Sequence, residues 1–401
     1  MHYPEQIRLQ FPLLVRNPEL AWLDNAATTQ KPAQVIDAIR MLYESDNANI
    51  NRGLYDIAVR ATAGYESVRK VVAEFIGAGE RNIVYTSGTT GGVNMVARCY
   101  LQPKLKAGSE VLISAMEHHA NLIPWQIACK NSGASLRVIP IDEDGVLNMG
   151  EFRNMLSANT AMVAVTHVSN TLGTVNPVEE IIELAHSVGA RVLVDAAQSI
   201  AHYPIDVSEM NADFLAFSAH KMFGPTGIGV LYGKEEVLSE MEPPNYGGDM
   251  IRTVSYQDCT LADIPRRLEA GTPHVAGVFG LGEAIGFIQH LDRTAVRESL
   301  HDLTTYATEQ LLGVNGVTLI GRAPSKSSIL SFTAPGVHPH DMATVLGTRQ
   351  IAVRAGHHCT QPLMNHFGIS GTTRASISIY NTRDEIDRLV SGVRDAINFF
   401  S

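Results

Sequence analysis

Short apolar runs alternate with helical periodicities through most of the chain. Helical patterns cover residues 32–43, 58–76, 92–100, 122–131, 150–156 and 178–188. The strand-like runs are Ile83–Thr86, Val111–Ser114, Leu136–Ile141, Met162–His167, Arg191–Val194, Phe214–Phe217 and Ile228–Tyr232. Strands that alternate with helices predict an α/β fold with a mainly parallel, seven-stranded sheet. The nearly continuous apolar character of the runs predicts that helices cover both faces of this sheet.

The pattern changes near Leu291, where a smaller α+β domain is predicted. Its helices are expected at 294–312 and 340–346, and its strands at 317–320, 329–332, 351–353 and 374–380. The last helix opens with Thr382 and has Glu385 three residues later, which is a capping-box pattern. We therefore expect an N-terminal segment (1–20) packed on the small domain, a large domain (21–290) and a small C-terminal domain (291–401).

Composition narrows the possible classes of function. The chain has 401 residues, of which 45% are hydrophobic and 18% are charged, so it can bury a large core. A net charge of −10 argues against nucleic acid or an anionic membrane as the main partner. No apolar run is long enough to span a bilayer and no signal-peptide core is present, so a cytoplasmic location is expected.

Polar residues follow five of the predicted strands directly. In open α/β sheets, ligands bind outside the carboxyl ends of the strands, so these residues are expected to meet at one rim. The segments concerned are 87–90, 117–119, 169–170, 195–198 and 218–221.

Lys221 is the most informative of the rim residues. It follows an apolar strand within the stretch Phe217–Gly233, beside Ser218 and His220 and before a run of glycines. A lysine amine forms a Schiff base with a carbonyl cofactor when its neutral form is accessible. Taken alone, the stretch fits an ordinary hairpin with an exposed lysine nearly as well.

Asp195 and the Gly88–Gly92 turn supply the other parts that a pyridoxal-phosphate site needs. Asp195 ends a very apolar strand, where a carboxylate is costly to bury without a cationic partner such as a protonated pyridine nitrogen. The Gly88–Gly92 turn offers hydroxyls and free N–H groups for a phosphate. A Schiff-base lysine, a carboxylate and a phosphate cradle are the elements of this chemistry. His118 is placed to stack on the ring and to move protons.

Cys359 is a candidate nucleophile. It lies in the loop Arg354–Thr360, which contains glycine and two histidines, and this setting is typical of a reactive thiol. A metal site that combines this loop with His118 and His119 is the competing interpretation, but neither an HxxxH nor a CxxC spacing supports it. Arg374 is placed to pair with a substrate carboxylate, or else forms a surface salt bridge.

With these residues in view, the chain resembles the class II cysteine desulfurases among the fold-type I pyridoxal-phosphate enzymes. This group includes the cysteine sulfinate desulfinase type, the desulfurase of the Suf system and selenocysteine lyase-like proteins. The matching stretches span nearly the whole chain in the family order. They are LDNAATTQKP (23–32), SGTTGGVNMVA (87–97), MEHHANLIPWQ (116–126), THVSNTLGTVNP (166–177), VDAAQS (194–199), FSAHKMFGPTGIGVLYG (217–233), LEAGTPHVAG (268–277), VRAGHHCTQPLM (353–364) and RASISIYNT (374–382).

The resemblance implies a role for each of twelve residues. Lys221 would carry the cofactor and Cys359 would accept the sulfur. The cofactor would also be held by Asp195 at the pyridine nitrogen, His118 on the ring, Gln198 near the ring oxygen, and Thr90, Ser218 and His220 at the phosphate, with Thr272 reaching the phosphate from a second subunit. The substrate would be held by Asn170 and Arg374, with Arg354 near the cysteine.

The resemblance also implies an activity and partners. L-cysteine would be converted to L-alanine, and the persulfide on Cys359 would pass to a small acceptor protein of the SufE type for iron–sulfur cluster or other cofactor assembly. A homodimer is implied, and no metal.

Two departures from the family pattern bear on substrate approach and the dimer interface. Asn51 and Tyr55 stand where relatives often carry histidines, and Gly91 stands where a glutamate is common.

Three other functions are weighed against the desulfurase. Selenocysteine lyase or cysteine sulfinate desulfinase as the main activity would make Cys359 less important. An aminotransferase gives no reason for Cys359. A non-catalytic sulfur-relay scaffold is disfavoured by the intact Lys221, Asp195 and Cys359.

Overall fold

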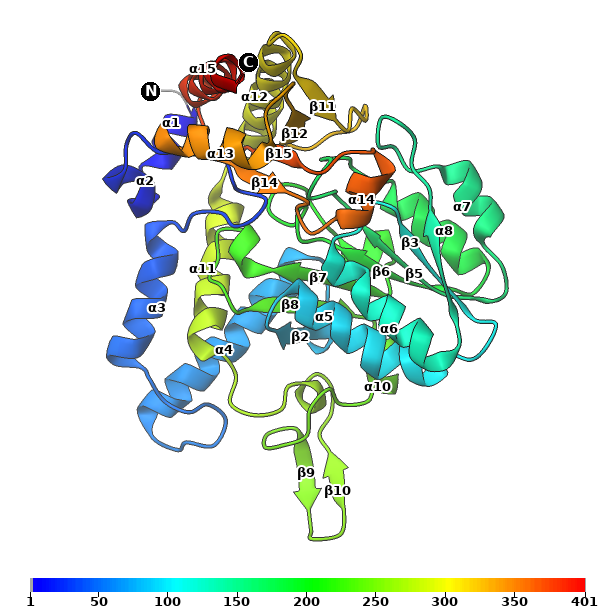
Figure 1. Cartoon of the computed structure of the whole chain (residues 1–401). Helices are drawn as coiled ribbons and strands as arrows, with labels where there is room; N and C mark the ends of the chain where they lie inside the picture. The colour runs from blue at the N-terminus through cyan, green and yellow to red at the C-terminus, as the bar shows by residue number, and fades with distance from the viewer. Residues whose placement is uncertain (1–2, 401) are drawn as a thin grey trace.

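The structure is a computed structural model that describes residues 3–400, so the expectations for residues 1, 2 and 401 lie outside the described residues. A seven-stranded sheet forms the centre of the large domain (Figure 1), in the order β2-β8-β7-β6-β5-β3-β4. The strands are β2 (Ile83–Thr86), β3 (Glu110–Ser114), β4 (Ser135–Ile139), β5 (Thr160–Thr166), β6 (Arg191–Asp195), β7 (Phe214–Ser218) and β8 (Gly229–Gly233). Strand β8 runs antiparallel to both of its neighbours, β2 and β7. The predicted α/β fold with a mainly parallel sheet is confirmed.

Two hydrophobic cores cover the two faces of this sheet. Side chains alternate along each strand, so Leu112 of β3 enters one core while Val111 and Ile113 enter the other. The helices α4 (Asp56–Phe75), α8 (Val178–Ser187), α9 (Val207–Met210) and α11 (Val275–His290) contribute to the first core. The second core includes residues of α5 (Thr89–Met95), α6 (Ile123–Ser132) and α10 (Glu235–Glu240). Helix α5 continues as a π-helix over Val96–Leu101.

Two further helices and a hairpin complete this part of the chain. They are α3 (Ala33–Ser45), which packs on α11, α7 (Met149–Met155), and the strands β9 (Ile251–Val254) and β10 (Cys259–Leu261). Figure 1 shows the β9–β10 hairpin projecting away from the body of the molecule.

The small domain is built on a second, antiparallel sheet with the order β11-β12-β15-β14. Its strands are β11 (Thr318–Ile320), β12 (Ile329–Thr333), β14 (Arg354–Gly356) and β15 (Thr372–Ser376). Its helices are α12 (Arg293–Leu312), α13 (Pro339–Thr348), α14 (Gln361–His366) and α15 (Arg383–Phe400). The predicted capping box of α15 is confirmed, since Thr382 N donates to Glu385 Oε2 (3.1 Å) and Glu385 N donates to Thr382 Oγ1 (3.4 Å).

The N-terminal segment lies against this domain, and both ends of the chain lie on that side of the molecule (Figure 1). It forms α1 (Tyr3–Arg8) and α2 (Pro12–Arg16), and Arg8 pairs with Glu385 of α15 at 2.7 Å. The strand β1 (Ala21–Trp22) then pairs in parallel with β13 (Ile351–Ala352).

Three differences from the sequence-based expectations are described here. The strand expected at 374–380 ends at Ser376. The hairpin β9–β10 was not predicted, because its strands are short and largely exposed. Helix α11 was not predicted either, because it is apolar on most of its circumference and shows no clear amphipathic pattern. Within residues 3–400 no helix is long and apolar enough to cross a membrane.

Candidate active site

A cavity of about 260 Å³ opens at the carboxyl ends of the parallel strands, where the small domain meets the large one. Eleven of the twelve residues expected in the site line it. They are Thr90, His118, Asn170, Asp195, Gln198, Ser218, His220, Lys221, Arg354, Cys359 and Arg374. The exception is Thr272, which is exposed and lines a second cavity of about 490 Å³. The predicted convergence of polar residues at one rim is therefore confirmed.

Lys221 reaches the cavity from a short turn after β7. The loop 24–29 packs on this turn, because Thr29 N donates to His220 O (3.0 Å) and Phe223 N donates to Thr29 Oγ1 (2.8 Å). Burial lowers the pKa of Lys221, although the negative charge of Asp195 opposes this shift. The neutral amine, which is the reactive form, therefore exists at lower pH than for an exposed lysine.

Asp195 is the last residue of β6, and its side chain is buried. Its Oδ1 accepts a hydrogen bond from Ala197 N (2.9 Å). Burial raises the pKa of Asp195, and the nearby Lys221 opposes this rise. Because the buried carboxylate of Asp195 accepts few hydrogen bonds, a further cationic partner would stabilise its charged form.

The hydroxyl groups of Thr89, Thr90 and Ser218 line the same cavity as Lys221. Ser218 Oγ accepts a hydrogen bond from Thr89 N (2.8 Å) and shares another with Thr89 Oγ1 (2.9 Å). Gly88 has φ +136°, and a Cβ at this position would lie 3.0 Å from Ser218 Oγ, so glycine allows the two segments to approach. Burial and, secondarily, Lys221 lower the pKa of His220 to about 4, so its imidazole is neutral. Thr89 was not singled out from the sequence, where nothing separates it from Thr90.

His118 presents a neutral imidazole to the cavity. Burial, followed by the charge of Lys221, lowers its pKa to about 3. Its Nδ1 accepts a hydrogen bond from Ala120 N (3.0 Å), which leaves the ring proton on Nε2. The preceding residue, Glu117, is buried and accepts hydrogen bonds from Asn121 Nδ2 (2.6 Å) and Thr166 N (2.9 Å). Glu117 thereby links the segment after β3 to the end of β5.

Cys359 enters the cavity from the small domain and is itself exposed. His358 and Cys359 both have left-handed backbones, with φ of 51° and 58°. Two hydrogen bonds hold the loop against the large domain: His119 N donates to Cys359 O (2.7 Å) and Asn170 Nδ2 donates to His358 O (2.8 Å). The thiol is therefore presented to the cavity on a fixed, strained loop.

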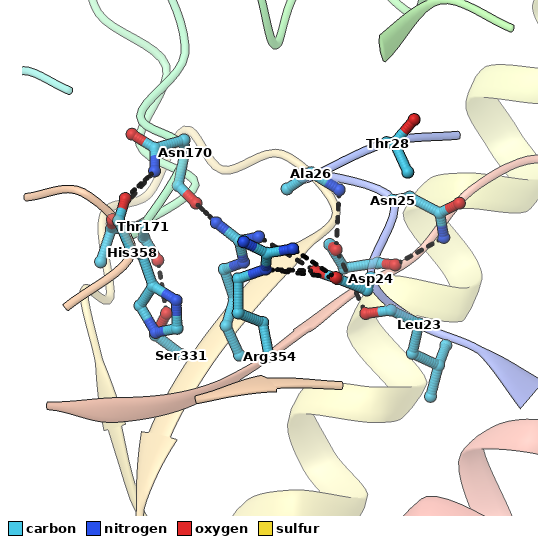
Figure 2. Close-up of polar contacts among 12 residues, drawn as sticks. Leu23, Asp24, Asn25, Ala26, Thr28, Asn170, Thr171, Ser331, Arg354 and His358 are labelled. Atoms are coloured by element: carbon cyan, nitrogen blue, oxygen red, sulfur yellow. Dashed lines mark hydrogen bonds and ion pairs between the residues drawn. The ribbon is translucent and has the colours of Figure 1, made fainter. Parts of the chain in front are cut away.

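The two candidate substrate-binding arginines, Arg354 and Arg374, pair with the same carboxylate, that of Asp24. Figure 2 shows the contact between Arg354 and Asp24. Arg374 is buried and donates from one terminal nitrogen to Asn170 O (2.8 Å) and from the other to Asp24 Oδ1 (3.2 Å). Burial lowers the pKa of Arg374 to about 10, and Asp24 opposes the shift. Arg354 pairs with the same carboxylate at 3.1 Å. Asp24 lies in the matching stretch 23–32, but the sequence assigned it no role.

The lining of this cavity fits pyridoxal phosphate. The buried Asp195 supplies the anion that a pyridinium needs, Lys221 supplies a partly neutral amine, and Thr89, Thr90 and Ser218 supply hydroxyls for a phosphate. Over residues 3–400 no group of three or more histidine, cysteine or acidic side chains is arranged to hold a metal ion. The histidines beside Cys359 and His118 therefore do not form such a group.

Comparison with known proteins agrees with this chemistry. Residues 21–389 match the aminotransferase class-V family. A "probable cysteine desulfurase" from Halalkalibacterium halodurans is 45% identical over 399 residues, which cover 98% of each chain. Another from Mycolicibacterium paratuberculosis is 47% identical over 392 residues, which cover 97% of this chain but 57% of that protein. The crystal structure of the cysteine desulfurase CsdA from Escherichia coli is 39% identical, covers both chains fully and superposes with a TM-score of 0.93.

Proposed function

Because the chain belongs to the aminotransferase class-V family, and within it to the pyridoxal-phosphate-dependent cysteine desulfurases, we propose that it transfers the sulfur of L-cysteine to Cys359. The observation that carries this proposal is the position of Cys359. An exposed thiol on the small domain shares one cavity with Lys221 and Asp195 of the large domain. An aminotransferase has no use for a thiol at this place.

Residues of the large domain would hold the cofactor. Lys221 would bind it covalently, and Asp195 would pair with its ring nitrogen. His118 would cover the ring and Gln198 would lie near the ring oxygen, while Thr90, Ser218 and His220 would hold the phosphate; all seven residues line the cavity. When bound, pyridoxal phosphate supplies an electron sink for the bonds that break in the substrate.

Arg374 and Asn170 would hold the substrate carboxylate, with Arg354 near Cys359. Asn170 acts through its backbone carbonyl, which orients Arg374 (2.8 Å), and through its side chain, which fixes the loop of Cys359. This arrangement places the substrate sulfur towards the thiol.

Two groups of the chain move protons. Lys221 Nζ takes the proton from the substrate α-carbon, since burial lowers the pKa of its amine. The neutral imidazole of His118 donates and accepts at Nε2, because Nδ1 is committed to Ala120 N.

Cys359 then attacks the substrate sulfur as a thiolate. A sulfur–sulfur bond forms and the carbon–sulfur bond breaks. The electron pair of the broken bond stays with carbon, which takes up a proton and leaves as L-alanine, while a persulfide remains on Cys359.

We further propose that a small thiol-bearing protein of the SufE type takes the persulfide, since Cys359 is exposed to such a partner. A homodimer is supported by two observations at the second cavity. Thr272 is exposed there, and the buried hydroxyls of Tyr65 and Tyr85, which also line it, have no hydrogen-bond partner within residues 3–400. A cytoplasmic location is supported by Cys99, Cys129, Cys259 and Cys359, which are free thiols.

Alanine formation from L-cysteine in the presence of a reductant tests this function. The wild-type protein forms alanine, and Cys359→Ala loses this activity while it retains the absorbance of bound cofactor. Cys259→Ala is the matched control, because it removes another exposed thiol far from the cavity, on the β9–β10 hairpin. Equal rates in wild type and Cys359→Ala would instead assign a lyase of the selenocysteine or cysteine sulfinate type, for which the thiol is incidental.

A further inference from the structure

The ammonium group of Lys31 holds the turn that carries Lys221. Lys31 Nζ donates to Thr28 Oγ1 (3.1 Å), to His220 O (3.3 Å) and to Thr29 O. His220 O accepts three further hydrogen bonds, from Thr29 N (3.0 Å), Thr28 Oγ1 (3.0 Å) and Thr29 Oγ1 (3.2 Å). The carbonyl that precedes Lys221 in the chain is therefore bound by four donors, and one of them carries a charge.

This ammonium group has no anionic partner in the described part of the chain. Its three hydrogen-bond acceptors are neutral oxygen atoms. Burial lowers the pKa of Lys31 to about 8, and no carboxylate of residues 3–400 opposes this shift. Lys31 is therefore still charged at pH 7. A half-buried ammonium without an anion costs folding free energy, so its charge calls for an explanation.

The residues proposed to hold the cofactor phosphate carry no positive charge of their own. Thr90 and Ser218 offer neutral hydroxyls. Burial first, then Lys221 and Lys31, lower the pKa of His220 to about 4, so its imidazole is neutral. Lys221 would use its amine for the covalent bond to the cofactor. A phosphate monoester carries a charge of about −1.5 to −2 at pH 7, which these groups leave unbalanced.

We propose that Lys31 is a positioning residue for the cofactor phosphate, and that its positive charge, acting through the His220 peptide, favours a dianion at Thr90, Ser218 and His220. This inference rests on the proposed function, in which these three residues hold the phosphate. The field of Lys31 reaches the His220 side chain, since it contributes to the low pKa of that imidazole. Lys31 itself does not line the cavity, so it acts without touching the cofactor.

Pyridoxal, which lacks the phosphate, is the matched ligand for the test. Cofactor-free protein is titrated with pyridoxal phosphate and with pyridoxal, and the absorbance of the Schiff base with Lys221 gives a Kd for each. Both ligands use Lys221, so the ratio of the two Kd values isolates the phosphate. We expect Lys31→Gln to lower the preference for pyridoxal phosphate over pyridoxal about tenfold, because it removes a positive charge near the dianion.

Lys31→Arg separates the charge of Lys31 from its shape. Arginine keeps the positive charge, so this variant should retain most of the preference for pyridoxal phosphate. A merely structural role in holding the loop 28–31 would weaken the binding of both ligands alike and leave their ratio unchanged. An equal loss of preference in Lys31→Gln and Lys31→Arg, or an unchanged preference in Lys31→Gln, would overturn the inference.

Lys326→Gln is the matched control. Burial lowers the pKa of Lys326 to about 8 as well, and its Nζ donates only to neutral oxygens, Gly321 O (2.8 Å) and Leu172 O. Lys326 does not line the cavity either, and its acceptors lie outside the turn of Lys221. The variant therefore removes an equivalent charge elsewhere and should keep the wild-type preference. A loss equal to that in Lys31→Gln would show that the preference follows net charge, which contradicts the inference.

The wild-type protein supplies a second test if the variants do not fold. Lys31 loses its charge as the pH rises through about 8, so the preference for pyridoxal phosphate should fall between pH 7 and pH 9. The neighbouring groups do not produce this change: His220 is already neutral, Lys221 bonds to both ligands, burial raises the pKa of Tyr380, and Asp24 is ion-paired. A preference that is constant or rises over this range contradicts the inference.

Failure of the proposed function gives a different result. A protein that binds pyridoxal phosphate with the expected preference but forms no alanine from L-cysteine would contradict the proposed sulfur transfer and support the role of Lys31. A protein that forms alanine but shows the same preference in wild type and Lys31→Gln would contradict the role of Lys31 alone.

Discussion

The environment of Lys221 determines whether its amine can react near neutral pH. Burial lowers the pKa of Lys221 from 10.5, and Asp195 raises it in part. A lysine whose pKa is lowered becomes neutral, and hence nucleophilic, at a lower pH than an exposed lysine. The effect of burial and the effect of the Asp195 charge on this pKa can be separated experimentally, because replacing Asp195 removes only the effect of its charge.

We predict that Lys221 of the cofactor-free protein reacts with an amine-directed aldehyde with a midpoint below pH 10.5. Asp195→Asn should move this midpoint further down, because it removes the charge that stabilises the ammonium form. Peptide mapping after reduction, repeated across pH, measures the midpoint. Lys70, whose side chain is 63% exposed, is the internal reference, and a Lys221 midpoint at or above that of Lys70 contradicts the prediction.

Single residues were predictable where they follow an apolar strand. Lys221 and Asp195 could be located in this way, because the end of a parallel strand places them at the rim. Asp24 could not, because its role depends on Arg354, which lies 330 residues away. The parallel pairing of β1 with β13 brings them together, and nothing in the sequence specifies the partner of so short a strand.

A buried ion pair joins helix α4 to the segment that precedes α11. Arg69 of α4 and Glu269 have side chains that are 4% and 11% exposed, and they are 2.9 Å apart. Glu269 Oε1 also accepts a hydrogen bond from Tyr85 N of β2 (2.6 Å). This carboxylate therefore connects three elements of the large domain.

We predict that Glu269→Ala lowers the free energy of unfolding by about 3 kcal/mol, because it leaves a buried guanidinium without its main partner. Glu235→Ala is the control: it breaks the exposed pair with Arg81 and should cost at most about 1 kcal/mol. Urea denaturation of the two variants and the wild type measures both values. Equal losses in the two variants would show that burial of the Arg69 pair is unimportant.

The elements of the chain differed in how well the sequence predicted them. The strands of the large sheet were found because short β-branched runs between helices are distinctive. The antiparallel direction of β8 was not predicted, because it depends on the tight turn after Lys221 and not on the composition of the strand. Helix α11 was missed because a helix buried on most sides lacks a polar face.

Buried titratable groups make the stability of the whole molecule depend on pH. Burial lowers the pKa of His118, His167, His202, His220 and His358 below the ordinary value of 6.5. Burial raises the pKa of three carboxyl groups, those of Glu117, Asp195 and Glu385. Between about pH 4.5 and 6.5 the unfolded chain therefore binds more protons at the histidines, and the folded chain binds more at the carboxyls.

Near pH 6 and below, most of the five histidines are protonated in the unfolded chain and outnumber the three carboxyls. We therefore predict that the free energy of unfolding falls as the pH is lowered from about 6 towards 4.5. Urea titrations of the cofactor-free protein at several pH values measure this slope. His202→Gln should reduce it, because burial lowers the pKa of His202 to about 4 and the variant removes one such group. Stability that is constant or rises on acidification contradicts the prediction.

The measurement that tests the central proposal most directly is a single turnover without reductant or acceptor, followed by mass spectrometry of the peptide that contains Cys359. We expect about one alanine per active site and one additional sulfur atom on Cys359, with neither product in Cys359→Ala. Alanine released without sulfur on Cys359, or equally from Cys359→Ala, would contradict the assignment of Cys359 as the sulfur acceptor.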